Sequence, residues 1–108
     1  MDYRLIYMTA ASAEEAGKLG KGLVEARLCA CANILGPIRS FYWWQGKLEE
    51  GAEVALIAKT RADLVEAATA WVKSQHSYSV PCVVSLPIDG GNADFLKWIG
   101  EETREDSE

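Results

Sequence analysis

A tight turn between two long strand-like segments constrains the fold of this chain most. Residues 29–44 and 48–60 are rich in aliphatic and aromatic side chains, and Gln45-Gly46 lies between them. A glycine-containing pair in this position predicts a β-hairpin. Gly36-Pro37 interrupts the first strand, and proline donates no hydrogen bond to a sheet. We therefore expect a kink, a bulge or an edge position there.

The segments around the hairpin alternate between strand and helix patterns. Ser12 followed by Glu15 is typical of a helix start, and Thr60 or Asp63 is expected to cap a second helix. The order strand, helix, strand, strand, helix, strand, helix predicts an α+β fold. It is a ferredoxin-like βαββαβ unit with an extra C-terminal helix, whose antiparallel sheet is covered by helices on one face. The expected segments are residues 3–9, 13–28, 29–44, 48–60, 64–72, 82–88 and 95–99.

The length of 108 residues is enough for one domain with its own core, which we place at residues 1–100. Residues 101–108 contain five acidic residues and one arginine, and are expected to form a disordered, solubilising tail. The net charge is −5, so the body without this tail is nearly neutral. A neutral body lacks the basic field that nucleic-acid binding needs. No apolar run approaches the ~20 residues of a membrane-spanning helix.

The cysteines and the first residues indicate the compartment. Met1-Asp2-Tyr3-Arg4 shows no signal-peptide pattern, and an internal disulfide framework would leave one of the three cysteines over. Reduced thiols in the cytoplasm are therefore expected. Cys29 and Cys31 lie two apart on a predicted strand. They are either a pair of ligands for a soft ion or small buried apolar residues.

Four consecutive aromatic residues, Phe41 to Trp44, precede the turn. Side chains alternate along a strand, so Phe41 and Trp43 face one way while Tyr42 and Trp44 face the other. Because helices cover only one face of the sheet, two large aromatic side chains would be exposed on the other. We therefore expect a homo-oligomer that buries this face or extends the sheet edges. The alternative is that the aromatic residues curl over one small core.

Few residues offer catalytic or metal-binding chemistry. His76 is the single histidine, and it lies after a predicted helix, where the helix dipole favours it without any further function. It is also a candidate metal ligand or acid–base group. Cys82 follows six residues later and meets His76 only if the intervening loop folds back. Glu53, Lys59 and Asp63 are candidates for an electrostatic site, although surface ion pairs are the commoner reading. No arrangement typical of an enzyme stands out.

Several segments together resemble the CutA family of divalent-cation-tolerance proteins. The resemblance covers about residues 4–100, and its pieces recur in order along the chain. They are Thr9-Ala10, residues 30–33, residues 42–49 (Tyr-Trp-Trp-Gln-Gly-Lys-Leu-Glu), Glu53, Lys59-Thr60, His76-x-Tyr78-x-x-Pro81, residues 86–88 and Phe95-Leu96-x-Trp98.

The resemblance implies a ferredoxin-like subunit in a homotrimer, whose long hairpin strands pair across subunits through edge strands. It implies no enzymatic activity and a role in divalent-cation tolerance, with copper as the candidate metal ion. The family commonly has glutamate where this chain has Cys82, and some copper-binding members have cysteine and histidine where Met8 and Gln75 stand here. A soft set of Met8, His76 and Cys82 would favour Cu(I).

The same resemblance also suggests a second reading, because the fold is similar to that of the trimeric PII signalling proteins. In that reading the protein senses a small molecule in a cleft between subunits. Lys59 would meet an anionic group of the ligand. A stable structural scaffold is the third alternative. The cleft residues would be Tyr42, Trp44, Lys59 and Tyr78, with His76 beside them.

Overall fold

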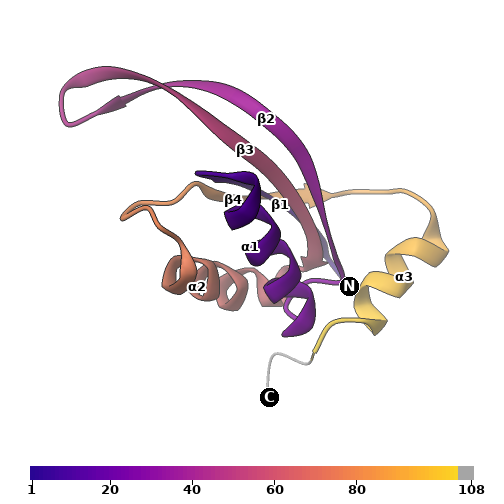
Figure 1. Ribbon diagram of the computed structural model, residues 1–108. Helices are drawn as coiled ribbons and strands as arrows, with labels where there is room; N and C mark the ends of the chain where they lie inside the picture. The colour runs from indigo at the N-terminus through magenta and orange to yellow at the C-terminus, as the bar shows by residue number, and fades with distance from the viewer. Residues whose placement is uncertain (105–108) are drawn as a thin grey trace.

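A computed structural model describes residues 1–104 and confirms the ferredoxin-like α+β fold with its extra C-terminal helix (Figure 1). A short 3₁₀ turn at Ala62–Leu64 precedes the second helix. The helices and strands are β1 (Tyr3–Ala10), α1 (Ala13–Glu25), β2 (Cys31–Trp44), β3 (Lys47–Arg61), α2 (Val65–Gln75), β4 (Val83–Ile88) and α3 (Ala93–Glu101).

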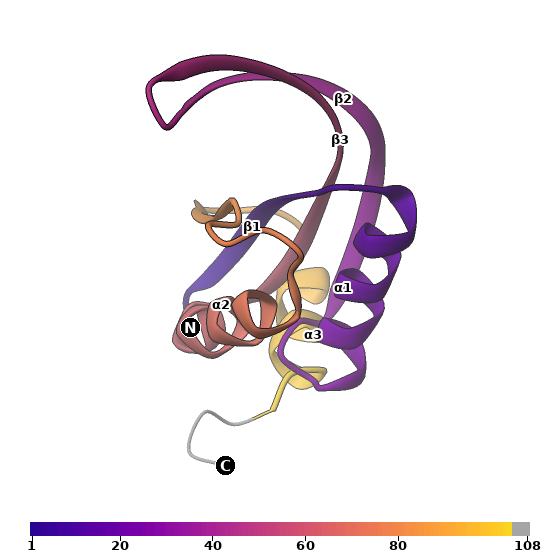
Figure 2. The ribbon, with the colours of Figure 1, turned by 60° about the vertical axis from the view of Figure 1, so that its left-hand side comes forward.

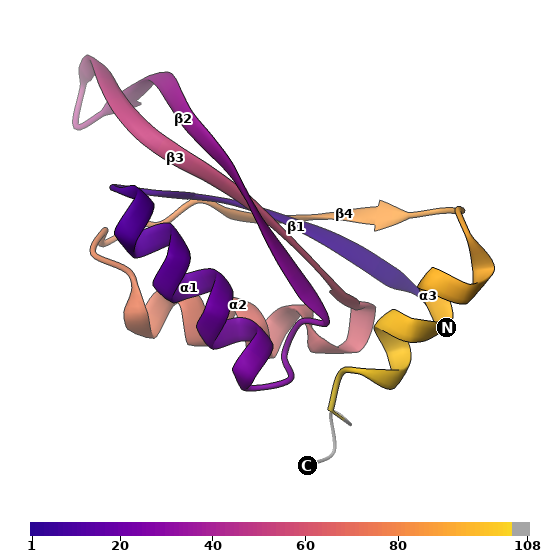
Figure 3. The same cartoon turned by 45° about the vertical axis from the view of Figure 1, so that its right-hand side comes forward.

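The four strands form one antiparallel sheet in the order β2-β3-β1-β4. Helices α1 and α2 lie against one face, and α3 lies beside the end of the sheet that holds the N-terminus (Figure 3). The core fills the space between the sheet and the first two helices. Its largest fully buried side chains include Ile6, Met8, Leu19, Leu23, Leu56 and Val72. The prediction of helices on one face is therefore confirmed for α1 and α2.

Local chemistry sets the helix ends. The Ser12 hydroxyl accepts a hydrogen bond from the Glu15 N–H at 3.1 Å, which confirms the predicted start of α1. This helix ends at Glu25, earlier than expected, and Arg27 then adopts a left-handed φ of 62°. The predicted caps of α2 are wrong. Thr60 donates its hydroxyl to the Leu28 carbonyl, and Asp63 pairs with Arg61.

The β2–β3 hairpin is longer than the rest of the sheet and arches over its uncovered face (Figures 1 and 2). Strand β1 ends where Ala10 pairs with Val54, so the outer half of the hairpin pairs with no third strand among residues 1–104. A β-bulge between Ile34 and Gly36 confirms the expected irregularity, and Gly36 has a φ of 117°. The bulge shifts the alternation of side chains by one residue, so the side chains of Tyr42 and Trp44 lie under the arch.

The C-terminal segment is ordered further than predicted. Asn92 caps α3 by accepting from the Asp94 N–H at 3.0 Å, and α3 includes Glu101. Thr103 is buried, and the Arg104 N–H donates to the Arg27 carbonyl at 2.9 Å. The predicted acidic tail thus overlaps the end of a packed helix, and its residues 105–108 lie outside the described residues. Within residues 1–104, no helix is long and apolar enough to cross a membrane.

Candidate functional site

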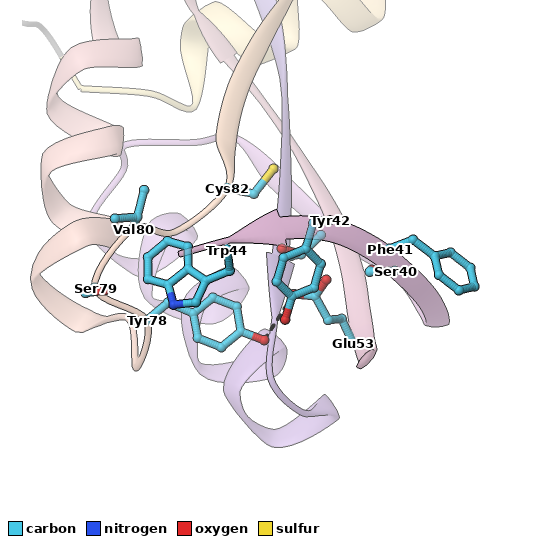
Figure 4. A pocket seen from close by; sticks show the side chains of 10 residues that line it. Ser40, Phe41, Tyr42, Trp44, Glu53, Tyr78, Ser79, Val80 and Cys82 are labelled. Carbon is cyan, nitrogen blue, oxygen red and sulfur yellow. Dashed lines mark hydrogen bonds between the residues drawn. The ribbon is translucent and has the colours of Figure 1, made fainter. Parts of the chain in front are cut away.

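A pocket of about 450 Å³ lies under the hairpin arch, where β2 and β3 face the loop between α2 and β4 (Figure 4). We call it the arch pocket. Its size is within the range of small-molecule sites. Strands β1, β2 and β3 supply one side, and the loop supplies the other. The lining residues are Thr9, Ser40, Phe41, Tyr42, Trp44, Glu53, Tyr78, Ser79, Val80 and Cys82.

Three aromatic side chains and one carboxylate lie together in this pocket. Figure 4 shows the rings of Tyr42, Trp44 and Tyr78 side by side near Glu53, whereas Phe41 points away. The Tyr78 hydroxyl donates a hydrogen bond to the Glu53 carboxylate at 3.0 Å. The β3 residue that pairs with Tyr42 lies an even number of positions from Glu53 along that strand. Because side chains alternate along a strand, Tyr42 and Glu53 lie on the same side of the hairpin.

The electrostatics of the pocket are set by Glu53. Burial raises the pKa of Tyr78 to about 12, and the hydrogen bond and negative charge of Glu53 add to this shift. Tyr78 therefore stays a neutral donor at physiological pH. Within residues 1–104, the Glu53 carboxylate accepts a hydrogen bond from Tyr78 alone and forms no ion pair with a basic side chain.

A buried histidine fixes the loop that carries Tyr78. The His76 side chain is fully buried, and its Nε2 lies 2.7 Å from the Thr9 carbonyl oxygen. Its Nδ1 accepts the Tyr78 N–H at 3.1 Å. Because Nδ1 is the acceptor, the proton of the neutral ring is on Nε2, which donates to Thr9. Both ring nitrogens are thus engaged with the backbone.

Glu15 strengthens this attachment from the start of α1. Its carboxylate accepts hydrogen bonds from the Ala11 N–H at 2.8 Å, the Ser77 N–H at 2.8 Å and the Ser77 hydroxyl at 3.1 Å. Burial alone would raise the pKa of Glu15, but these hydrogen bonds and the nearby His76 outweigh it and lower the pKa. Glu15 and His76 together hold the loop against the end of β1.

The structure does not bring the three predicted copper ligands together. Met8 is fully buried in the core with α1 and α2, while its neighbour Thr9 points into the arch pocket. Cys82 lines the pocket, and burial and the Glu53 charge raise the pKa of its thiol, partly offset by the Thr9 hydroxyl. Met8 and Cys82 therefore lie on opposite faces of the sheet. Within residues 1–104, no group of three or more His, Cys, Asp and Glu side chains has metal-binding geometry.

Lys59, the predicted partner of an anion, is not among the residues that line the arch pocket. Its Nζ donates to the Asn33 side-chain oxygen at 2.9 Å, lies 3.8 Å from the Cys31 sulfur, and stands 5.9 Å from the Phe95 ring centre. Cys29 precedes β2 and is fully buried in the core, where burial raises the pKa of its thiol to about 12. This placement agrees with the reading of Cys29 as a small buried apolar residue.

The resemblance assigned Tyr42, Trp44 and Tyr78 to a cleft between subunits, and the structure places all three in one pocket of a single chain. The roles of two acidic residues were not predicted. Glu53 was considered beside Lys59, yet among residues 1–104 Glu53 is the one charged side chain that lines the pocket. Glu15 was assigned only to the helix start, although it also binds Ser77. The spacing of Glu15 in its capping pattern carries no signal for a contact 62 residues away along the chain.

Comparison with known proteins agrees with this architecture. A model of the family described as CutA1 divalent ion tolerance protein matches residues 4–102. The chain is 46% identical over 99 residues to the divalent-cation tolerance protein CutA of Archaeoglobus fulgidus, covering 92% of this chain and 96% of that protein. The crystal structure of CutA1 from Oryza sativa has a TM-score of 0.94 at 42% identity, covering 97% of this chain and 96% of that one. The structure of the periplasmic divalent cation tolerance protein CutA from Archaeoglobus fulgidus gives 0.89 at 46% identity, over 93% of this chain and 97% of that one.

Proposed function

This chain belongs to the CutA1 divalent ion tolerance family. We propose that it is a non-enzymatic protein that binds a small ligand in the arch pocket. The observation that carries the proposal is a pocket that holds three aromatic rings together with a carboxylate that has no basic partner within residues 1–104. Pockets with apolar walls and a few oriented polar groups are the usual form of ligand sites.

The proposed assembly is a homotrimer formed through edge strands, as the resemblance implies. In the part of the chain that the structure describes, the outer edge of β2 and the outer half of the hairpin have no further strand beside them. Large apolar side chains are exposed there, with Trp43 at 74% and Leu48 at 65%. Such a surface supports association, because soluble monomers seldom leave contiguous apolar patches in water. The proposed compartment is the cytoplasm, supported by three free cysteines.

A ligand screen followed by thermal unfolding tests ligand binding. We expect at least one class among nucleotides, organic anions and organic cations to raise the unfolding temperature of the wild-type protein. Trp44→Leu should abolish that rise, whereas Trp43→Leu, which changes the neighbouring ring on the other side of the strand, should retain it. If no class stabilises the wild-type protein, the arch pocket is not a small-molecule site.

Copper binding is the second candidate function, and the position of Cys82 favours it. The thiol faces the arch pocket near the Glu53 charge, although Met8 and His76 are engaged elsewhere. Thiolate ligands suit Cu(I). Titration of the reduced protein with Cu(I) against a competing chelator, with Cys82→Ser, His76→Ala and Met8→Leu in parallel, tests the predicted set. Tight binding at one ion per chain that Cys82→Ser removes would support it, and no competition with the chelator would exclude it.

A further inference from the structure

We infer that the arch pocket selects an organic cation, a ligand whose positive charge sits on an alkylated ammonium or a guanidinium group. The inference rests on the proposed ligand-binding function and assigns the charge of the ligand. It replaces the expectation of an anion, which depended on Lys59.

The charges around the pocket favour a cationic ligand. Glu53 is the one ionised side chain among the described residues that line it, and none of them is basic. The carboxylate is half-buried and accepts one hydrogen bond from a neutral phenol. A partly desolvated carboxylate without a counter-charge attracts a cation and repels an anion.

The aromatic walls of the pocket also favour a cationic ligand. The rings of Tyr42, Trp44 and Tyr78 lie side by side in the pocket, and Glu53 lies next to Tyr42 and the Tyr78 hydroxyl (Figure 4). The faces of aromatic rings are electronegative, so they attract a cation that lies over them, and tryptophan does so best. A box of rings with one acidic side chain is therefore suited to a bulky, weakly hydrated cation, with the alkyl groups on the rings and the charge near Glu53.

An inorganic metal ion suits the same walls less well. Calcium and magnesium take six or more oxygen ligands, and zinc takes four nitrogen, sulfur or oxygen ligands. Within residues 1–104, the pocket offers one carboxylate, a few hydroxyls and one thiol, and no cluster of metal-binding side chains. Three aromatic rings supply no donor atom for such an ion.

Three probes of nearly equal shape test the charge of the ligand. They are (2-hydroxyethyl)trimethylammonium, its neutral carbon analogue 3,3-dimethylbutan-1-ol, and the anion 3,3-dimethylbutanoate. Ligand-observed NMR on the wild-type protein measures the three dissociation constants. We expect the ammonium to bind about tenfold more tightly than the alcohol, and the carboxylate to bind least.

Two pairs of variants locate the effect. Glu53→Gln removes the charge and Trp44→Leu removes one wall, and each should weaken ammonium binding about tenfold. The matched controls are Glu50→Gln, an exposed carboxylate paired with Arg39, and Trp43→Leu, and both should leave the affinity unchanged. Sedimentation and unfolding midpoints show which variants keep the native assembly. If a pocket variant does not fold, the comparison of the three probes on the wild-type protein still decides.

Three outcomes would overturn the inference. The first is equal binding of the ammonium and the alcohol, which would leave the pocket a ligand site without charge preference. The second is tighter binding of the carboxylate. The third is no binding of the ammonium. Failure of the proposed function is a separate result, because it requires that no class in the broader screen stabilises the protein.

Discussion

The role of His76 is decided by its hydrogen bonds. Its buried ring joins the Thr9 carbonyl of β1 to the Tyr78 N–H of the loop. His76→Ala would leave these backbone groups unpaired and open a cavity. We expect a loss of about 2–4 kcal/mol in the free energy of unfolding. Gln75→Ala, at an exposed neighbour, should change it by less than about 0.5 kcal/mol. Urea denaturation at one protein concentration measures both.

The opposite result would identify His76 as a ligand. If His76→Ala unfolds at the wild-type urea concentration but no longer binds Cu(I), the ring is available to metal and the two backbone contacts contribute little. Two measurements on the same variant, the free energy of unfolding and the Cu(I) affinity, thus distinguish a structural role of His76 from a ligand role.

Glu15 gives the molecule a pH-dependent contribution to stability. Its pKa is lowered from 4.5 in the folded state, so its hydrogen bonds to Ala11 and Ser77 stabilise the fold fully above pH 4.5. This contribution is lost as the pH falls through the lowered folded-state pKa. Glu15→Gln should therefore cost about 1 kcal/mol at pH 7 and much less at pH 3. Urea unfolding at both pH values tests this, with Glu14→Gln as control. An equal cost of Glu15→Gln at both pH values would contradict a role for the charge.

At the scale of elements, α1 contains glycines with different surroundings. A Cβ at Gly22 would collide with the Trp71 ring of α2, whereas a Cβ at Gly17 meets nothing within 4 Å. Gly22→Ala should therefore lower the free energy of unfolding by about 1–3 kcal/mol. Gly17→Ala should raise it by about 0.5–1 kcal/mol, because alanine loses less backbone freedom in a helix. Thermal unfolding of both variants measures the difference. A stabilised Gly22→Ala variant would mean that α1 and α2 are not packed at this contact.

The elements were predictable where their signals are local. Ser12 and Asn92 are side chains that cap the helix beside them, and Gln45-Gly46 closes the hairpin between its own strands. The start of α2 was not predictable, because Thr60 and Asp63 bind groups outside that helix. The direction in which Tyr42 and Trp44 face depends on the bulge at Ile34/Gly36, whose position the sequence marks only through Gly36-Pro37.

The candidate site was predictable only in part, because it joins segments far apart in the chain. The resemblance brought Tyr42, Trp44 and Tyr78 together, and the structure places all three in the arch pocket. It also grouped Met8 with Cys82, which the alternation of side chains on β1 separates onto opposite faces. Whether a residue faces the core or the pocket follows from strand register, and register is a property of the paired strands rather than of either segment.

At the scale of the whole molecule, the uncovered face of the sheet predicts self-association. Leu5 and Leu86 are paired neighbours on this face, and Leu86 is 48% exposed. We expect sedimentation equilibrium to give three times the 11.8-kDa mass of the chain at micromolar concentration. The thermal midpoint should rise with protein concentration, because association stabilises the folded state by mass action.

A charge on this face should disrupt the assembly. Leu86→Lys would place a positive charge where a partner's apolar surface is expected, and burying it unpaired is costly. Its sedimentation mass should therefore fall toward that of one chain. Glu66→Lys also introduces a lysine, but at an exposed position of α2 on the helix side, and should leave the mass unchanged. A wild-type mass of 11.8 kDa, or a Leu86→Lys mass equal to that of the wild type, would show that this face is not the subunit interface.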